Sequence, residues 1–185
     1  MRVSEVLLLN SIMNLLGKLK KLGGNLVNIT LITVGKIKEK YLRDAIDEYS
    51  KRLSRYCKLE IIELQDEKTP DNASEKEELQ IKEKEGQSIL SKIKDNAYVV
   101  AMDLKGKQIS SEEFANFIDN CGLEGNSNLV FIIGGSLGLS DQVIKRANYK
   151  ICFSKMTFPH QLFRVMLLEQ IYRGYRIIKG EPYHK

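Results

Sequence analysis

The first residues with chemical potential follow an apolar run, residues 129–133, which ends in Gly134 and Gly135. A run of that length that ends in glycine is typical of a buried parallel strand opening into a loop. Open α/β sheets bind ligands at such strand ends. Glycine lacks a Cβ and adopts positive φ readily, so backbone N–H groups can approach a bound molecule closely. A tight strand-to-helix turn without a ligand explains the two glycines equally well.

A second loop, residues 153–158, follows the next predicted strand and returns to the same edge of the sheet, which favours a pocket there. The glycine motif itself, Gly134-Gly135-Ser136-Leu137-Gly138, is neither G-x-G-x-x-G nor G-x-x-x-x-G-K-[ST]. It lies after the fourth predicted strand, and no acid that could hold a ribose follows it. A nicotinamide dinucleotide is therefore disfavoured and a P-loop is excluded, which leaves a pocket lined mainly by backbone.

The last predicted helix is apolar around most of its circumference and carries two polar stripes. At about 100° per residue, His160 and Arg164 fall on one side, and Glu169, Arg173 and Arg176 fall on the opposite side. This pattern suits a helix held between its own sheet and a partner subunit. For Glu169 and Arg173 alone, a simple ion pair within the helix, worth about 0.2–0.5 kcal/mol, is the favoured interpretation.

The chain ends in a short basic and aromatic segment, residues 181–185. Tyr183 could stack on a nucleobase, and His184 could hydrogen-bond or exchange a proton near neutral pH. From Lys155 onward, six Lys or Arg residues stand against two Glu residues, an excess that could attract a phosphate backbone. Disorder of the terminal residues and a solvated basic face are the alternatives, and the composition alone favours them.

Five strands alternate with five helices in the predicted order of elements, which indicates one α/β domain with a mainly parallel sheet flanked by helices. The predicted strands are residues 29–34, 59–64, 97–104, 129–133 and 149–153. The predicted helices are residues 39–56, 75–93, 110–120, 141–147 and 159–179. Ser74 with Glu77, and Ser110 with Glu113, provide helix-start signals.

Composition limits the class of protein. At 185 residues, with 43% hydrophobic and 29% charged residues and a net charge of +5, the chain fits one soluble domain. Its three cysteines are far apart and unpaired in any C-x-x-C motif, which predicts reduced packing residues in a cytoplasmic protein. With two histidines and no cysteine cluster, a zinc site is not expected.

The first 26 residues differ from the rest, with leucine-rich and basic stretches typical of a weak amphipathic helix. Their apolar run is too short to span a bilayer, and no small-residue cleavage site follows it. Residues 1–26 are therefore predicted to be a leader or an upstream extension from a misassigned start site, and residues 27–185 the folded domain. N-terminal mass spectrometry of the native protein tests this prediction.

Four blocks of sequence resemble a known family, the small SPOUT-class methyltransferases that methylate N3 of a pseudouridine in 23S ribosomal RNA. They are Gly134-Gly135-Ser136-x-Gly138-Leu139, residues 153–161, the helix from Arg164 to Arg173, and Pro182-Tyr183-His184-Lys185. Val34-Gly35-Lys36 and Glu83-Lys84-Glu85-Gly86 also match the family. The resemblance covers residues 28–185, and residues 1–26 have no counterpart.

The resemblance implies a SPOUT α/β fold with a C-terminal trefoil knot, a homodimer, and S-adenosylmethionine as the methyl donor. The pocket for that cofactor, transferred by motif, consists of Met102, Gly134, Phe153, Ser154, Lys155, Met156, Thr157 and Phe158. Family members often have leucine at the position of Met102, and methionine keeps an apolar wall of similar volume. The substrate implied is 23S ribosomal RNA in the assembled large subunit or ribosome, with no membrane contact.

The resemblance also implies roles in catalysis. Tyr183 and His184 of the partner subunit would hold the target base, with His184 a candidate proton acceptor. Arg164, Arg173 and His160 would bind RNA phosphate or position the base, while Glu169 would orient an arginine. N3 is a weak nucleophile until its proton leaves, whereas the sulfonium methyl is already activated, so alignment is the main requirement and no metal is needed.

Two other functions stay open from the residues. A non-catalytic RNA-binding factor for ribosome assembly could use the same basic end of the chain, and binding of S-adenosylmethionine would distinguish it from an enzyme. A nucleotide-binding oxidoreductase would need a cofactor for which the glycine loop is poorly suited. The net charge of +5 is modest for an RNA-modifying protein, which favours recognition of the ribosome's shape over affinity for free RNA.

Overall fold

The computed structural model describes residues 27–183, in which five strands alternate with five helices. The strands are β1 (Asn28–Val34), β2 (Lys58–Leu64), β3 (Tyr98–Gln108), β4 (Asn128–Ile133) and β5 (Tyr149–Cys152). The helices are α2 (Lys40–Leu53), α3 (Glu75–Leu90), α4 (Ser111–Leu123), α5 (Asp141–Arg146) and α6 (His160–Ile178). The predicted leader, residues 1–26, lies outside the described residues.

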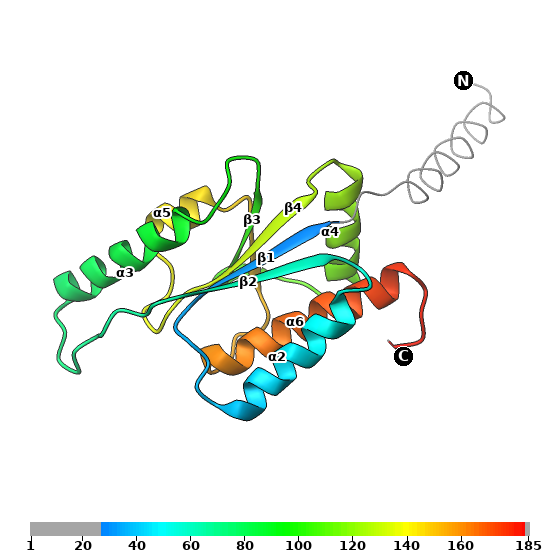
Figure 1. Cartoon of the computed structure of the whole chain (residues 1–185). Helices are drawn as coiled ribbons and strands as arrows, with labels where there is room; N and C mark the ends of the chain where they lie inside the picture. The colour runs from blue at the N-terminus through cyan, green and yellow to red at the C-terminus, as the bar shows by residue number, and fades with distance from the viewer. Residues whose placement is uncertain (1–26, 184–185) are drawn as a thin grey trace, which may run out of the picture.

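The strands form one five-stranded sheet in the order β2-β1-β4-β3-β5, and every neighbouring pair is parallel (Figure 1). The prediction of a mainly parallel α/β sheet is confirmed. Parallel neighbours require crossover connections, which the intervening helices supply. All five strands therefore end at the same edge of the sheet, and this edge carries the loops that the sequence singled out.

Side chains alternate between two buried faces along each strand. On β1, Ile29 and Leu31 pack toward α2, α4 and α6, whereas Ile32 and Val34 pack toward α3 and α5. Figure 1 shows α3 and α5 on one side of the sheet, with α2 and α6 on the other. Because both faces are covered, the strands read as apolar runs rather than as polar–apolar alternation.

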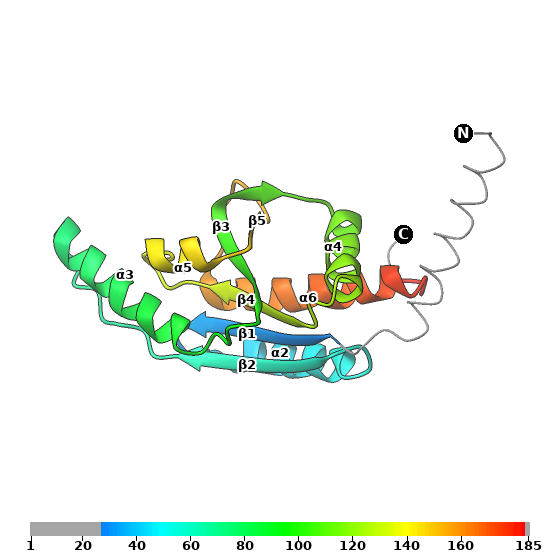
Figure 2. The same cartoon turned by 90° about the horizontal axis from the view of Figure 1, so that it is seen from above.

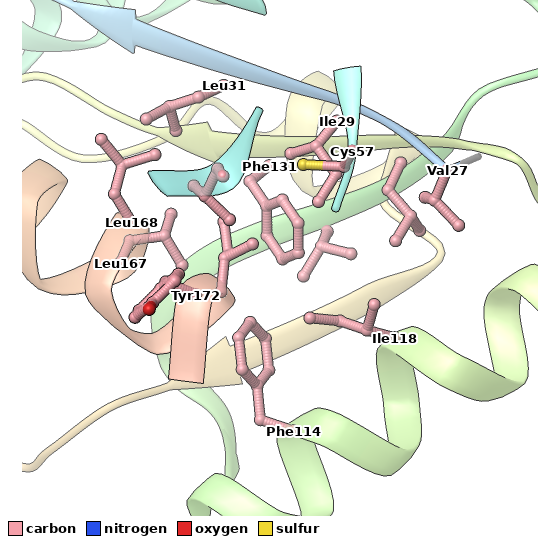
Figure 3. Close-up of a cluster of buried hydrophobic side chains, with 14 of the residues drawn as sticks. Val27, Ile29, Leu31, Cys57, Phe114, Ile118, Phe131, Leu167, Leu168 and Tyr172 are labelled. Atoms are coloured by element: carbon pink, nitrogen blue, oxygen red, sulfur yellow. The ribbon is translucent and has the colours of Figure 1, made fainter. Parts of the chain in front are cut away.

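Helix α6 is apolar on most sides because it is covered on most sides. It lies on the sheet between α2 and α4 (Figure 2). Its Leu167 and Leu168 are fully buried beside Phe131 of β4, as the close-up of the core shows (Figure 3). The two helices next to α6 therefore explain much of the burial that the sequence pattern led us to expect from a partner subunit.

Strand β3 departs from its predicted end. We expected the strand to stop at residue 104, before the Lys-Gly-Lys turn, but it continues to Gln108. The pairing with β5 shifts between Met102 and Lys107, both opposite Ile151, so the intervening residues bulge out before the strand resumes. A Cβ on Gly106 would stand 2.6 Å from the backbone carbon of Ile151. The glycine that resembled a turn signal instead allows close strand packing.

The helix starts agree with the capping signals. Ser74 and Ser110 each form a complete capping box, with Glu77 and Glu113 respectively. In each box the serine hydroxyl accepts from the backbone N–H three residues on, and that residue's carboxylate accepts from the backbone N–H of the serine. Pro159, predicted to lie in the first turn of the last helix, instead occupies the N-cap of α6, one position before the helix begins.

Candidate functional site

Three segments assigned to the cofactor pocket meet on adjacent strands at one level of the sheet. Ala101 of β3 pairs with Ile132 of β4, so Met102 lies one residue beyond this pair and Gly134 lies two residues beyond it. On the other side of β3, Met102 pairs with Ile151 of β5, two residues before Phe153. The register thus brings these positions together at the carboxyl edge, where open parallel sheets hold ligands.

The glycine loop after β4 is a closed turn. Gly135 and Gly138 form an isolated β-bridge, in which the Gly138 N–H donates to the Gly135 carbonyl at 3.0 Å. Gly138 has φ +82°, a conformation that side chains disfavour. A Cβ on Gly134 would lie 2.9 Å from the carbonyl carbon and oxygen of Gly138, so any side chain there would force the backbone apart. The motif therefore encodes a compact turn at the sheet edge.

Helix α3 packs against the glycine turn and the start of α5. A Cβ on Gly86 would stand 2.1 Å from Oγ of Ser140, so the missing side chain lets α3 pack directly on the N-cap of α5. The neighbouring Glu85 is buried, and its carboxylate oxygen would be 2.8 Å from a Cβ on Gly135. Burial raises the pKa of Glu85, against the lowering effect of the hydrogen bond from the Glu67 N–H. The Glu83–Gly86 motif thus supports the site through packing.

The loop of residues 153–158 is fixed at both ends and open in the middle. The rings of Phe153 and Phe158 both pack on Phe163 of α6, with centroid distances of 5.0 and 6.3 Å. Between them, Ser154 Oγ accepts from the Met156 N–H at 3.0 Å, which closes a small turn. Lys155, Met156 and Thr157 are exposed. Such a loop can present backbone groups and mobile side chains to a ligand while its anchors stay in the core.

A cavity of about 510 Å³ opens beside this loop, within the size range of small-molecule sites. Its walls are mostly apolar, and a few polar groups come from the start of α4 and the middle of α6. The lining residues are Tyr49, Ile109, Ser110, Ser111, Phe114, Phe153, Phe158, Val165, Met166, Glu169 and Gln170. Two of the assigned cofactor residues, Phe153 and Phe158, and one assigned catalytic residue, Glu169, therefore share this cavity.

Glu169, Arg173 and Tyr183 form one connected group at the edge of the cavity. Oε1 of Glu169 accepts from Nη2 of Arg173 at 2.6 Å and from Nε at 2.9 Å. The Arg173 guanidinium also lies 4.8 Å from the centroid of the Tyr183 ring, within cation–π range. The hydrogen bond to Glu169 raises the pKa of Arg173, and burial raises the pKa of Tyr183 to about 12. Arg173 is therefore charged and Tyr183 is neutral at physiological pH.

Arg164, to which the resemblance assigned an RNA contact, is buried, and both terminal nitrogens of its guanidinium donate hydrogen bonds within the protomer. Its Nη1 donates to Oε1 of Glu63 at 2.7 Å, and its Nη2 donates to the carbonyls of Val34 and Gly35 at 2.7 and 3.0 Å. These contacts tie α6 to the ends of β1 and β2. A guanidinium held this way links these elements structurally, and because Arg164 also lines the second cleft, its assigned RNA contact stays a prediction.

His160 lies beside Arg164 at a second cleft of about 950 Å³, away from Glu169 and Arg173. This cleft also includes Gly135 and Ser136 of the glycine turn. Partial burial and the nearby charge of Arg164 lower the pKa of His160, which keeps the imidazole neutral at pH 7. The expected site residues therefore divide between two cavities, with the glycine turn bordering the second and the 153–158 loop bordering the first.

The sequence pattern did not indicate several residues that line the first cavity or support the site. Tyr49, Ser110, Ser111 and Gln170 line the first cavity, and Glu63 neutralises Arg164. Ser110 and Ser111 could have been found, since they follow β3 and strand ends meet at one edge. Glu63 gave no such signal, because its partner lies 101 residues away. His184, assigned to proton transfer, lies outside the described residues.

The three cysteines are free and buried, as predicted for packing residues. Burial raises the pKa of Cys57 and of Cys121 to about 11, so neither is a ready nucleophile. Among residues 27–183, no group of three or more His, Cys, Asp or Glu side chains could hold a metal ion. Within the same range, no helix combines the length and apolar character of a membrane span.

Comparison with known proteins gives one family. The family model described as "Predicted SPOUT methyltransferase" matches residues 27–184. Ribosomal RNA large subunit methyltransferase H of Clostridium beijerinckii is 80% identical over 159 residues, and the H 1 protein of Clostridium perfringens is 79% identical over the same length. The corresponding protein of Clostridium tetani is 73% identical. Each match covers 86% of this chain and 100% of the relative.

Two solved structures are more distant. The SpoU methyltransferase AviRb of Streptomyces viridochromogenes, in complex with AdoMet, is 10% identical with a TM-score of 0.43, covering 83% of this chain and 59% of that chain. The TrmH/SpoU tRNA modifying enzyme of A. aeolicus is 13% identical with a TM-score of 0.42, covering 92% of this chain and 86% of that chain.

Proposed function

Because the chain belongs to the SPOUT methyltransferase family, we propose that it transfers a methyl group from S-adenosylmethionine to N3 of a pseudouridine in 23S ribosomal RNA. Relatives that are 73–80% identical over their whole length and are named ribosomal RNA large subunit methyltransferase H support the substrate class. The observation that carries the proposal is the strand register, which gathers Met102, Gly134 and Phe153 at one sheet edge.

The residues at this edge suit S-adenosylmethionine. The 510 Å³ cavity offers aromatic and aliphatic walls for an adenosine, with serine, glutamine and carboxylate groups at its margin. Phe153 and Phe158 line this cavity, and the glycine turn borders the second cleft through Gly135 and Ser136. Met102, Gly134 and residues 153–158 would hold the cofactor, which when bound supplies a methyl group activated by the sulfonium charge. Alignment of that methyl with N3 is then the protein's main task.

The polar group on α6 provides the means of alignment. Glu169 fixes Arg173 through two hydrogen bonds, so the guanidinium presents a defined positive charge at the cavity margin. Tyr183 lies against that guanidinium and can hold a base by stacking or through its hydroxyl. His184, the next residue, is the proposed acceptor of the N3 proton. His160, neutral at pH 7, is proposed to position RNA through a hydrogen bond.

The proposal extends to assembly and location. The working unit would be a homodimer in which Tyr183 and His184 of one protomer, with Tyr183 restrained beside that protomer's own Glu169, also border the site of the partner subunit. Exposed apolar groups on loop 153–158 and at the start of α6, Met156 and Leu162, support a further contact surface. The trefoil knot implied by the family and the assignment of residues 27–185 as the methyltransferase domain belong to the same proposal. An enzyme acting on the large subunit or the ribosome would work in the cytoplasm.

Methyl transfer tests the proposal directly. Ribosomes, large subunits and naked 23S RNA, each lacking the modification, would be incubated with the chain and methyl-labelled S-adenosylmethionine, followed by nucleoside analysis. We expect one labelled N3-methylpseudouridine per assembled particle and little label in naked RNA. A variant truncated before Tyr183 should lose methyl transfer yet retain its fold and dimer. If the chain binds ribosomes but calorimetry detects no binding of S-adenosylmethionine, the protein is instead a non-catalytic assembly factor.

A further inference from the structure

The end of α6 turns the chain back on itself. Gly180 adopts φ +64°, its N–H donates to Ile177 at 3.0 Å, and the Glu181 N–H donates to Arg176 at 2.9 Å. These two bonds define a Schellman motif, the helix ending that glycine permits. The segment that follows therefore returns along α6 rather than leaving the molecule.

Glu181 joins the terminal segment to the end of α2 and to α6. Its Oε2 accepts from the hydroxyl of Tyr56, which follows α2, at 2.5 Å. The same oxygen lies 3.0 Å from Nη1 of Arg176 on α6. Arg176 also reaches the carbonyl of Pro182 through Nη2, at 3.5 Å. Glu181 and Arg176 are partly shielded, with side-chain exposures of 36% and 18%, so the carboxylate is held by charge and by a phenolic donor together.

This anchorage determines where Tyr183 lies. The Tyr183 ring, two residues beyond Glu181, packs edge-on against the Tyr172 ring, with 5.0 Å between the ring centroids. The Arg176 guanidinium lies 6.0 Å from the centroid of the Tyr183 ring. The Tyr183 hydroxyl donates to Glu169 at 3.3 Å. A short terminal segment would have little reason to adopt one position on its own, because ordering costs conformational entropy. The bonds to Glu181 supply that restraint.

We propose that Glu181, held by Tyr56 and Arg176, is a positioning residue that fixes Tyr183 at the Glu169 edge of the cavity. The inference rests on the proposed function, in which Tyr183 and His184 hold the target nucleotide. Glu181 itself touches neither cofactor nor base. An ion pair near the surface contributes little to global stability, so loss of this contact releases Tyr183 without unfolding the domain.

The experiment compares wild type, Glu181→Ala, Tyr56→Phe and the double variant in the methyl-transfer assay on large subunits or ribosomes. We expect each single change to lower kcat/KM by about tenfold or more, since displacement by about 1 Å can cost a hundredfold. The double variant should be little worse than either single one, because both changes break the same contact. The dissociation constant for S-adenosylmethionine should not change. Asp44→Ala, which breaks an exposed Lys40–Asp44 pair near the start of α2, serves as the matched control and should leave kcat/KM unchanged.

A second readout does not depend on activity. The chain contains no tryptophan, so Tyr183→Trp creates a single fluorescent reporter in the terminal segment. Its anisotropy should fall when Glu181→Ala is added and stay constant when Asp44→Ala is added. Unchanged anisotropy, or full activity of Glu181→Ala beside an active wild type, would overturn the anchoring role. An inactive wild type would overturn the proposed function instead, and the anisotropy would still decide the anchoring.

Discussion

The hydroxyl of Tyr183 donates a 3.3 Å hydrogen bond to Oε1 of Glu169, which lies 14 residues earlier on α6. The same carboxylate oxygen accepts from Arg173, and Glu169 also lines the cavity beside the 153–158 loop. One carboxylate thus connects the terminal segment, a cationic side chain and the cavity wall.

Glu169→Gln should impair catalysis more than stability. Glutamine keeps the shape of the side chain but removes the charge that orients Arg173, so we expect kcat to fall by about ten- to a hundredfold. The thermal midpoint should change little, since an ion pair within a helix is worth about 0.2–0.5 kcal/mol. Single-turnover methyl transfer measures the effect. Glu48→Gln, which breaks a 2.8 Å pair with Arg52 at the same spacing on α2, is the control, and an equal loss of activity there would refute a specific role for Glu169.

Gly134→Ala should weaken the binding of S-adenosylmethionine. The new Cβ would meet the Gly138 backbone at 2.9 Å, and backbone atoms cannot rotate away as a side chain could. Opening the turn costs about 1–3 kcal/mol, an overpacking penalty that corresponds to roughly a ten- to hundredfold loss of affinity if the turn must close to bind. Calorimetry gives the dissociation constant. Gly174→Ala on α6, whose Cβ would make contacts of 3.4 Å and longer with Ile118 and Ala115 of α4, should bind normally; wild-type affinity in Gly134→Ala would remove the turn from the site.

Arg164→Met should destabilise the fold by about 3 kcal/mol. The change leaves the Val34 and Gly35 carbonyls without a donor, and buried unsatisfied groups cost about 1–3 kcal/mol each. Urea denaturation followed by circular dichroism measures the free energy of unfolding. Arg55→Met, at an exposed position after α2, should stay within about 0.5 kcal/mol of wild type. A stable Arg164→Met protein that had lost only RNA affinity would instead support the RNA-contact role.

Stability should decline at alkaline pH through the buried thiols. Burial raises the pKa of Cys57 and of Cys121 from 9.0 to about 11, so the folded protein retains protons that the unfolded chain releases. The contribution to stability is complete below pH 9 and is lost as pH rises from 9 toward 11. Denaturation at a series of pH values tests the slope. At pH 8 both thiols should alkylate slowly in the native protein and rapidly in urea; fast native alkylation of Cys57 would contradict a packing role.

The fold was predictable where local patterns and tertiary packing agree. Apolar runs of strand length, separated by capped amphipathic helices, leave few arrangements other than a doubly covered parallel sheet. The end of β3 was not predictable, because Lys-Gly-Lys has the composition of a turn and only the adjacent backbone of Ile151 shows why Gly106 is needed. There the packing of β5 overrides the local turn signal.

The candidate site was predictable as a place but not as a set of contacts. Strand ends and glycines indicated the sheet edge, and the stripes of α6 indicated that His160 and Glu169 face different surroundings. The spacing on one helix could not show that Arg164 would meet Glu63, since that contact joins distant segments. The anchoring of the tail by Tyr56 escaped prediction for the same reason, with 125 residues separating Tyr56 from Glu181.

Modified-nucleoside mapping of 23S ribosomal RNA from a strain that lacks the gene tests the central claim most directly. We expect one pseudouridine to lose its N3 methyl group in the deletion strain and to regain it when the wild-type chain is supplied. The Gly134→Ala chain should restore it only in part. An N3-methylpseudouridine that persists in the deletion strain, or the loss of a methyl group from a different nucleoside, would contradict the proposed function.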